Sequence, residues 1–168
     1  MKKKYGILWV TLFVILDQIT KIMASVSLKG NEPIDIIRGV FRLEYLENTG
    51  IAFGLFKDKF FFFVLLTIVI LIVIGVIYYK LPDIKRFRPL QFCMIFIVAG
   101  AIGNMIDRVV HNYVIDFFYF NLIDFPIFNV ADIYVTVAVA FLFLLILFYY
   151  KEDELNFVSI SKKKQSNN

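Results

Sequence analysis

Residues 60–79 read FFFFVLLTIVILIVIGVIYY, twenty residues without a single charge. A helix needs about 20 mainly apolar residues to cross the hydrocarbon core of a membrane, so this stretch predicts a transmembrane helix. The rest of the chain agrees, because 60% of its 168 residues are hydrophobic and its mean hydropathy is +0.77. A soluble domain of this length could not bury so much apolar surface, which indicates an integral membrane protein.

Three other stretches are long enough and apolar enough to cross a membrane. Their expected bounds are 5–26, 90–108 and 127–150. Together with 60–79 they predict an all-α membrane protein built as a four-transmembrane-helix bundle. We expect residues 1–168 to form a single domain that ends in a polar cytoplasmic tail over 151–168.

The start of the chain allows two interpretations. Lys2, Lys3 and Lys4 followed by an apolar stretch resemble a secretory signal peptide. However, no small-residue cleavage site follows promptly, and Asp17 and Lys21 do not suit the apolar region of such a peptide. We therefore interpret this stretch as a retained first helix.

Positive charges beside the spans predict the orientation, because cytoplasmic loops are enriched in Lys and Arg. Eleven such residues fall on one side of the membrane and five on the other. The eleven are Lys2, Lys3, Lys4, Lys80, Lys85, Arg86, Arg88, Lys151, Lys162, Lys163 and Lys164. The five are Lys29, Arg38, Arg42, Lys57 and Lys59. The larger group includes both ends of the chain, so we expect both termini to be cytoplasmic.

Polar residues within the spans form three clusters at helical spacing. They are Asp17 with Lys21, Asn104 with Asp107 and Arg108, and Asn129 with Asp132. In the expected orientation all three lie near the extracytoplasmic face, and the span at 60–79 adds nothing polar. Because a charge in hydrocarbon is costly, such residues usually mark a working site. The outer third of the bundle is therefore where we expect the function.

The segment between the first two spans, residues 27–59, is too long for a simple connector. Residues 41–45 alternate apolar and polar side chains, which is typical of a strand. Asn48, Gly50 and Gly54 follow, and the two glycines allow turns or close approach of the backbone. We expect this segment to carry structure of its own.

The reactive side chains exclude several classes of protein. His111 is the single histidine and Cys93 the single cysteine, which excludes multi-His metal sites and internal disulfides and leaves Cys93 a packing role. The His-Glu-x-x-His motif of zinc proteases is absent, and no serine lies inside a later span. The net charge of +4 comes from basic residues that flank the spans, so we expect no nucleic-acid partner.

Carboxylates remain as candidates for chemistry. Asp116 lies in an apolar stretch between spans, and Asp132 follows at the head of the fourth span. Two carboxyl groups that share one proton can hydrolyse an amide, because the ionised one activates water and the protonated one polarises the carbonyl. Spacing alone leaves an alternative open: these acids could pair with Lys21 or Arg108 and hold the bundle together.

Five stretches in order resemble lipoprotein signal peptidase, the type II signal peptidase of bacteria. They are Asp17-Gln18-Ile19-Thr20-Lys21, Asn48-Thr49-Gly50-Ile51-Ala52-Phe53-Gly54, Gly100-Ala101-Ile102-Gly103-Asn104-Met105-Ile106-Asp107-Arg108, Val114-Ile115-Asp116-Phe117 and Phe128-Asn129-Val130-Ala131-Asp132. Each stretch is weak alone, but all five at matching positions on four predicted spans are specific. The resemblance runs nearly end to end.

This resemblance implies an aspartic endopeptidase of the bacterial plasma membrane, with two-Asp activation of water and no covalent intermediate. Its implied partners are prolipoproteins cut before a diacylglyceryl-modified cysteine, membrane lipid and globomycin-type inhibitors, with no cofactor and no metal. A small extracytoplasmic β-rich cradle would complete the fold, and the active site would lie near the extracytoplasmic face. Asp116 and Asp132 match the catalytic pair. The matching supporting or substrate-binding positions are Asn104, Arg108, Asn129, Asn48, Gly54, Asp17 and Lys21.

Some roles and two other functions stay open from the residues themselves. We interpret Asp17 and Lys21 as a structural ion pair, and Arg108 could either orient the acids or pair with Asp107. A proton-coupled transporter would need polar residues through the whole bilayer, which the apolar inner halves of the spans disfavour. A structural assembly subunit would use the polar clusters only to dock a partner.

Overall fold

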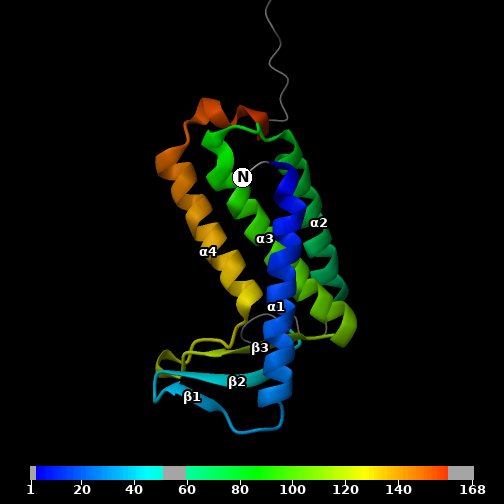
Figure 1. Cartoon of the computed structure of the whole chain (residues 1–168), viewed down its shortest axis with the longest axis vertical. Coiled ribbons are helices and arrows are strands. Elements are labelled where there is room, and N and C mark those ends of the chain that lie inside the picture. Colours follow the sequence, from blue (N-terminus) through cyan, green and yellow to red (C-terminus); the bar gives the residue numbers. More distant parts are fainter. Residues whose placement is uncertain (1–2, 51–59, 159–168) are drawn as a thin grey trace, which may run out of the picture.

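The structure is a computed structural model that describes residues 3–50 and 60–158. Four long helices run side by side, and a small sheet lies across one end of the bundle (Figure 1). The helices are α1 (Gly6–Leu28), α2 (Phe60–Lys80), α3 (Arg88–His111) and α4 (Val130–Leu144). One π-helical turn, Leu145–Tyr149, continues α4. Short 3-10 helices cover Lys3–Tyr5, Lys85–Phe87, Asn121–Ile123 and Glu152–Val158.

All four helices are long and apolar enough to cross a membrane, which confirms the predicted bundle. Their outward faces carry large exposed apolar side chains: Ile7 is 83% exposed, Val26 78% and Phe148 80%. Such a surface is unfavourable in water and suits contact with lipid. The chain is therefore a multi-pass membrane protein.

The sheet is antiparallel, in the order β1 (Ile34–Ile37), β2 (Phe41–Asn48) and β3 (Val114–Tyr119). The strand predicted at residues 41–45 is confirmed and extends to Asn48, whereas β3 was not predicted. The register pairs Leu46 with Asp116, so β2 lies directly beside the acid of β3. This sheet is the β-rich cradle expected from the resemblance, and we refer to β1, β2 and β3 as the cradle.

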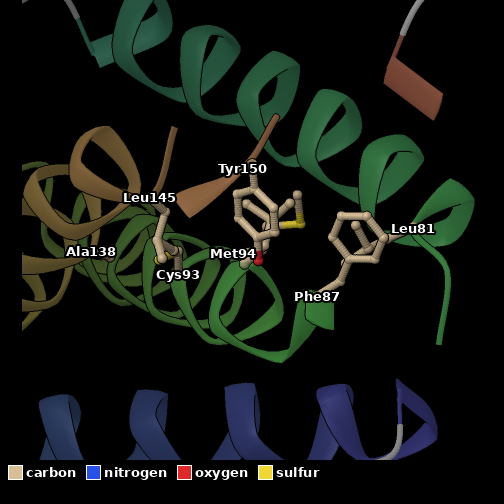
Figure 2. Packing of buried hydrophobic residues seen from close by; sticks show 8 residues of the cluster. Leu81, Phe87, Cys93, Met94, Ala138, Leu145 and Tyr150 are labelled. Carbon is tan, nitrogen blue, oxygen red and sulfur yellow. The ribbon is translucent and has the colours of Figure 1, made fainter. Parts of the chain in front are cut away.

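Two apolar clusters hold the cradle and the helices in place. One joins α1 to the cradle through Ala24, Leu28, Ile115 and Phe117. The other lies at the opposite end of the bundle and contains Leu81, Phe87, Leu90, Cys93, Met94, Ala138, Leu145 and Tyr150 (Figure 2). Cys93 is buried there among apolar neighbours, as predicted for a packing role.

Small residues on α3 allow its neighbours to approach closely, as the sequence predicts for this helix. A Cβ atom added at Gly100 would collide with the backbone oxygen of Ala131 on α4. A Cβ atom added at Gly103 would collide with the carboxylate of Asp17 on α1. The two glycines therefore set how near α1 and α4 come to the polar end of α3.

The start of α4 differs from the expected one. The apolar pattern places this span from about residue 127, but the helix begins at Val130 with Asn129 as its N-cap. The amide oxygen of Asn129 accepts the N–H of Asp132, and the Asp132 carboxylate accepts the N–H of Asn129, which is a capping box. Hydropathy alone cannot locate the start of α4, because Ile127 and Phe128, which precede the helix, are as apolar as the helix itself.

Candidate active site

Asp116 and Asp132 line one cavity of about 500 Å³ between the cradle and the bundle. Asp116 comes from β3, and Asp132 comes from the first turn of α4. Asn48 and Arg108 also line this cavity. Its other walls are mostly apolar and include Phe125, Pro126, Ile127, Phe128, Ile133, Thr136 and Val137. Two acids from different elements therefore face one shared cavity.

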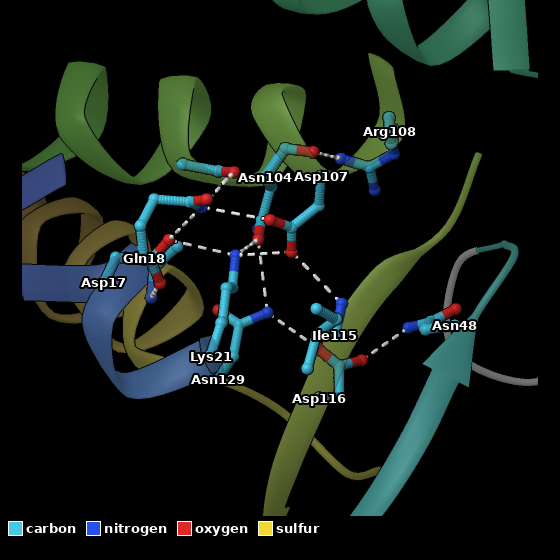
Figure 3. A network of polar contacts seen from close by, with 12 residues as sticks. Asp17, Gln18, Lys21, Asn48, Asn104, Asp107, Arg108, Ile115, Asp116 and Asn129 are labelled. Atoms are coloured by element: carbon cyan, nitrogen blue, oxygen red, sulfur yellow. Dashed lines mark hydrogen bonds and ion pairs between the residues drawn. The ribbon is translucent and has the colours of Figure 1, made fainter. Parts of the chain in front are cut away.

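Asp116 is almost completely buried, with 1% of its surface exposed. Its two carboxyl oxygens accept hydrogen bonds from the amide of Asn129, at 2.6 Å, and from the amide of Asn48, at 2.8 Å (Figure 3). Burial, and then the negative charge of Asp132, raise the pKa of the Asp116 carboxyl to about 7, while the two amide hydrogen bonds lower it. This acid can therefore hold a proton near neutral pH.

Asp132 is held by both a helix cap and a neighbouring side chain. One of its oxygens accepts the backbone N–H of Asn129 at 3.1 Å, and the other accepts the amide of Asn104 at 2.8 Å. Asn104 lies on α3, so this carboxylate joins two helices. Two hydrogen bonds therefore fix the position of the Asp132 carboxyl at the start of α4.

Arg108 and Asp107 are neighbours on α3 but face different surroundings. The guanidinium of Arg108 lines the cavity, donates to the backbone oxygen of Asn104 at 3.2 Å and lies 5.2 Å from the centre of the Phe63 ring. Asp107 is buried and pairs instead with Lys21 at 2.9 Å. Of the two roles considered for Arg108, this geometry favours the one beside the acids.

Asp17 and Lys21 form the expected ion pair, at 3.0 Å, and both are at most 1% exposed. The Lys21 ammonium also contacts Asp107 and donates to the amide oxygen of Asn104 at 2.9 Å (Figure 3). Asn104 in turn donates to Asp132. The first polar cluster of the sequence is therefore connected to the cavity through α3.

Known proteins match this chain over nearly its whole length. A profile described as signal peptidase (SPase) II matches residues 9–148. The chain belongs to the signal peptidase II family. Lipoprotein signal peptidase of Clostridium tetani (strain Massachusetts / E88) is 40% identical over 150 residues, which cover 88% of this chain and 93% of the relative. Lipoprotein signal peptidase of Clostridium novyi (strain NT) is 42% identical over 137 residues, which cover 80% of this chain and 91% of the relative.

Two solved structures of bacterial membrane enzymes resemble this chain over most of its length. A bacterial membrane enzyme determined by the in meso method at 2.3 Å resolution matches with a TM-score of 0.74 and 33% identity, covering 90% of this chain and 97% of that one. A second, at 1.9 Å resolution, matches with the same TM-score and 32% identity. As a signal peptidase II family member, the chain is a protease.

The structure brings together eight of the nine site residues predicted for this signal peptidase II family member. Six of them contact one another or line the cavity: Asn48, Asn104, Arg108, Asp116, Asn129 and Asp132. Asp17 and Lys21 lie one contact further away. Gly54 lies outside the described residues.

Sequence reasoning missed Gln18. Its amide donates to the carboxylates of Asp17, at 3.2 Å, and Asp107, at 3.0 Å, and to the backbone oxygen of Gly103, at 3.2 Å. One feature of the sequence could have indicated its role: Gln18 is a second polar residue, directly beside Asp17, in a mainly apolar span. Gln18 thus belongs to the polar contact between α1 and α3.

A resident metal has no suitable ligand group in the part of the chain that the structure describes. Within residues 3–50 and 60–158, no group of three or more His, Cys, Asp or Glu side chains is placed to hold a metal ion. The site contains two carboxyl groups, the guanidinium of Arg108, and three carboxamides that hydrogen-bond to the acids, of which Asn48 lines the cavity.

Proposed function

We propose that this protein is an aspartic endopeptidase that removes the signal peptide of prolipoproteins, cutting before the diacylglyceryl-modified cysteine. Membership of the signal peptidase II family supports the substrate class. The observation that carries the aspartic assignment is that Asp116 and Asp132 face one cavity and are linked through Asn129. No covalent intermediate is needed, because water is the nucleophile.

The two acids divide the work of hydrolysis. Asp132, whose oxygens accept hydrogen bonds from Asn104 and from the backbone of Asn129, acts as the base that takes a proton from water. Asp116, with its raised pKa, carries the proton and polarises the carbonyl of the bond to be cut. Because a coupled pair titrates as a unit, one proton shared by both acids is the active state.

Hydrolysis proceeds in two steps. Asp132 takes a proton from water as the water oxygen bonds to the carbonyl carbon, while Asp116 donates to the carbonyl oxygen. The tetrahedral intermediate collapses when its C–N bond breaks and the leaving amine of the cysteine takes the proton from Asp132. A hydroxyl of the intermediate returns its proton to Asp116 as the C=O bond re-forms, which restores the starting acid pair. The guanidinium of Arg108 and the amides of Asn48, Asn104 and Asn129 orient the acids throughout.

An apolar wall beside the acids supports a lipid-anchored substrate. Ile133, Thr136 and Val137 of α4 line the cavity, and Val137 is 62% exposed on the outer surface of the bundle. A substrate could therefore keep its acyl chains in the bilayer while its peptide bond reaches the acids. The same wall would accept globomycin-type inhibitors.

We also propose that both termini are cytoplasmic, which brings the cavity near the extracytoplasmic face. The Lys and Arg distribution of the sequence supports this orientation. The short helices Lys3–Tyr5 and Glu152–Val158 lie at the end of the bundle opposite the cradle (Figure 1), so the side of the membrane that they occupy decides that of the cavity. A cysteine-labelling experiment on intact cells, with single cysteines introduced at Asp35 and Asp153, tests this arrangement.

The alternative functions have less support. A proton pathway would need polar groups along the bundle, whereas the core at the far end of the bundle is built from apolar side chains. An assembly subunit would not need acids whose oxygens all point into one network beside a cavity. Cleavage of a precursor separates both alternatives from the peptidase.

The decisive experiment uses purified protein and a diacylglyceryl-modified precursor. Asp116→Asn and Asp132→Asn should each abolish release of the signal peptide while inserting into membranes as the wild type does. Asp35→Asn, an exposed acid of β1, is the matched control and should cleave normally. Near-normal cleavage by either cavity variant would overturn the proposed pair, and globomycin should block the wild-type reaction.

A further inference from the structure

We propose that Lys21 is a positioning residue of the acid pair, acting through Asn104, and that the Asp17–Lys21–Asp107 cluster sets the spacing of Asp116 and Asp132. This inference rests on the proposed function. Lys21 lines no part of the cavity among the described residues. Through Asp17 and Asp107, its contacts nevertheless lead to β3 and to the start of α4, the two elements that carry the proposed catalytic acids.

The two carboxylates beside Lys21 each hold the backbone next to a proposed catalytic acid. Asp17 accepts the N–H of Ala131 at 2.9 Å, the residue directly before Asp132. Asp107 accepts the N–H of Ile115 at 3.1 Å, the residue directly before Asp116.

Lys21 joins these two anchors into one unit. Its ammonium lies 3.0 Å from Asp17 and 2.9 Å from Asp107, so a single side chain fixes both carboxylates. Since each carboxylate holds one acid-bearing backbone, the distance between β3 and the start of α4 depends on Lys21. Figure 3 shows this cluster beside Ile115 and Asn129.

The third contact of Lys21 determines which way the Asn104 amide points. A carboxamide can rotate by half a turn and exchange its oxygen for its nitrogen, so its orientation depends on its partners. The Asn104 oxygen accepts from Lys21 at 2.9 Å and from Asn129 at 3.1 Å, which directs its nitrogen to Asp132.

The other two carboxamides are oriented by backbone donors. The oxygen of Asn48 accepts the N–H of Gly50 at 3.0 Å, and that of Asn129 accepts the N–H of Asp132 at 3.0 Å. Asn104 is different, because a cation on another helix orients it. Lys21 is therefore the side chain whose loss should disturb the site through one identifiable amide.

Stability alone gives a weak reason for this cluster. Replacing a buried ion pair by packed apolar side chains is often neutral or stabilising, whereas removing one partner alone is strongly destabilising. A single Lys21→Ala change would strand two buried carboxylates and test folding only. The test must therefore neutralise the cluster as a whole.

Two matched triple variants separate positioning from folding. D17N/K21M/D107N and D17N/K21Q/D107N are both uncharged, and both keep amide oxygens that can accept the N–H groups of Ala131 and Ile115. Met and Gln have similar length, but only Gln offers a donor to Asn104. Kinetics are measured on the full chain with a diacylglyceryl-modified precursor, and insertion and thermal unfolding are measured alongside.

We expect kcat of the Lys21→Met triple variant to be about tenfold to a hundredfold below that of the Lys21→Gln triple variant, at similar KM and similar unfolding temperature. Adding Asn104→Ala to both should erase this difference, because Lys21 acts through that amide. Equal kcat in the two triple variants would overturn the proposal, as would a difference that persists without Asn104. If neither triple variant accumulates in membranes, the role of Lys21 is in folding, and the proposal is also overturned.

The proposed function fails separately from this inference. If Asp116→Asn or Asp132→Asn cleaves normally, the acid pair itself is wrong. If both are inactive while the two triple variants have equal kcat, the pair stands and only the positioning role of Lys21 is lost.

Discussion

The amide nitrogen of Asn129 donates to the Asp116 carboxyl at 2.6 Å, while the amide oxygen of the same residue caps α4 by accepting the N–H of Asp132. One side chain therefore ends the loop, starts the helix and connects the two acids. The local rule for beginning a helix and the geometry of the site are met by the same residue.

Asn129→Asp should separate these two tasks. Asp caps a helix about as well as Asn, so the start of α4 should be kept, although the carboxylate buried at this position lowers stability. It cannot donate to Asp116, and it adds a negative charge beside that acid, so cleavage should fall by about a hundredfold or more. Asn129→Ala should lose both the helix cap and the hydrogen bond to Asp116, and its stability should fall by about 1 kcal/mol through the lost cap. Thermal unfolding and precursor cleavage measured together check this, and a destabilised but active Asn129→Asp would contradict it.

Asn48 should control the pH dependence of cleavage. Its amide hydrogen bond lowers the pKa of Asp116, which burial and the charge of Asp132 raise to about 7. The shared proton is held below that pKa and lost as pH rises through it, so the wild-type rate should fall above about pH 7. Asn48→Ala removes a donor to the carboxylate, which raises the pKa and moves the alkaline limb to higher pH.

The control for Asn48 is Asn31→Ala. The amide of Asn31 is exposed and donates to the backbone oxygen of Ser27, and Asn31 does not line the cavity. Its pH–rate profile should coincide with that of the wild type. A profile of Asn48→Ala displaced to lower pH would show that the amide acts on the acid in the opposite sense.

Gly103→Ala should damage the site through packing alone. The added Cβ atom would collide with the Asp17 carboxylate and lie 3.4 Å from the Cβ atom of Ala131. Displacing Asp17 breaks its hydrogen bond to the Ala131 N–H, so both stability and cleavage should fall. Gly75→Ala on α2 is the matched control, because nothing lies within 4 Å of its added Cβ atom. Thermal unfolding should distinguish the two, with Gly75→Ala at or above the wild type.

Hydropathy and spacing were sufficient to predict the four helices, and the alternation at residues 41–45 was sufficient for β2. They were not sufficient for β3. Residues 114–119 read VIDFFY, with four buried positions in succession, so no alternation of period two marks the strand. Its pairing with β2 comes from tertiary contact across the cradle, which a single sequence does not display.

The residues of the site could be predicted, but their connections could not. Asn104, Asp107 and Arg108 share helical spacing, which suggested one common face. In the structure Asp107 faces Lys21, whereas Arg108 faces the cavity. Spacing gives the direction of a side chain only to within a wide sector, so long side chains of neighbouring residues can reach different partners.

Arg108 offers the last test, because its charge and its shape can be separated. The guanidinium donates to the backbone oxygen of Asn104, lies over the Phe63 ring and acts electrostatically on Asp132 and Asp116. Arg108→Lys keeps the charge beside the acids but loses the planar group that stacks on the ring. Arg108→Gln loses the charge and keeps a donor.

If charge is the main contribution of Arg108, the Lys variant should retain about tenfold more kcat than the Gln variant. The positive charge of Arg108 favours the ionised form of the acids. Loss of this charge in Arg108→Gln should therefore move the alkaline limb of the pH–rate profile to higher pH, whereas Arg108→Lys should leave it in place. Purified enzyme assayed across the pH range checks both effects. Equal kcat and equal profiles for the two variants would mean that Arg108 contributes shape alone and that the acids need no cation beside them.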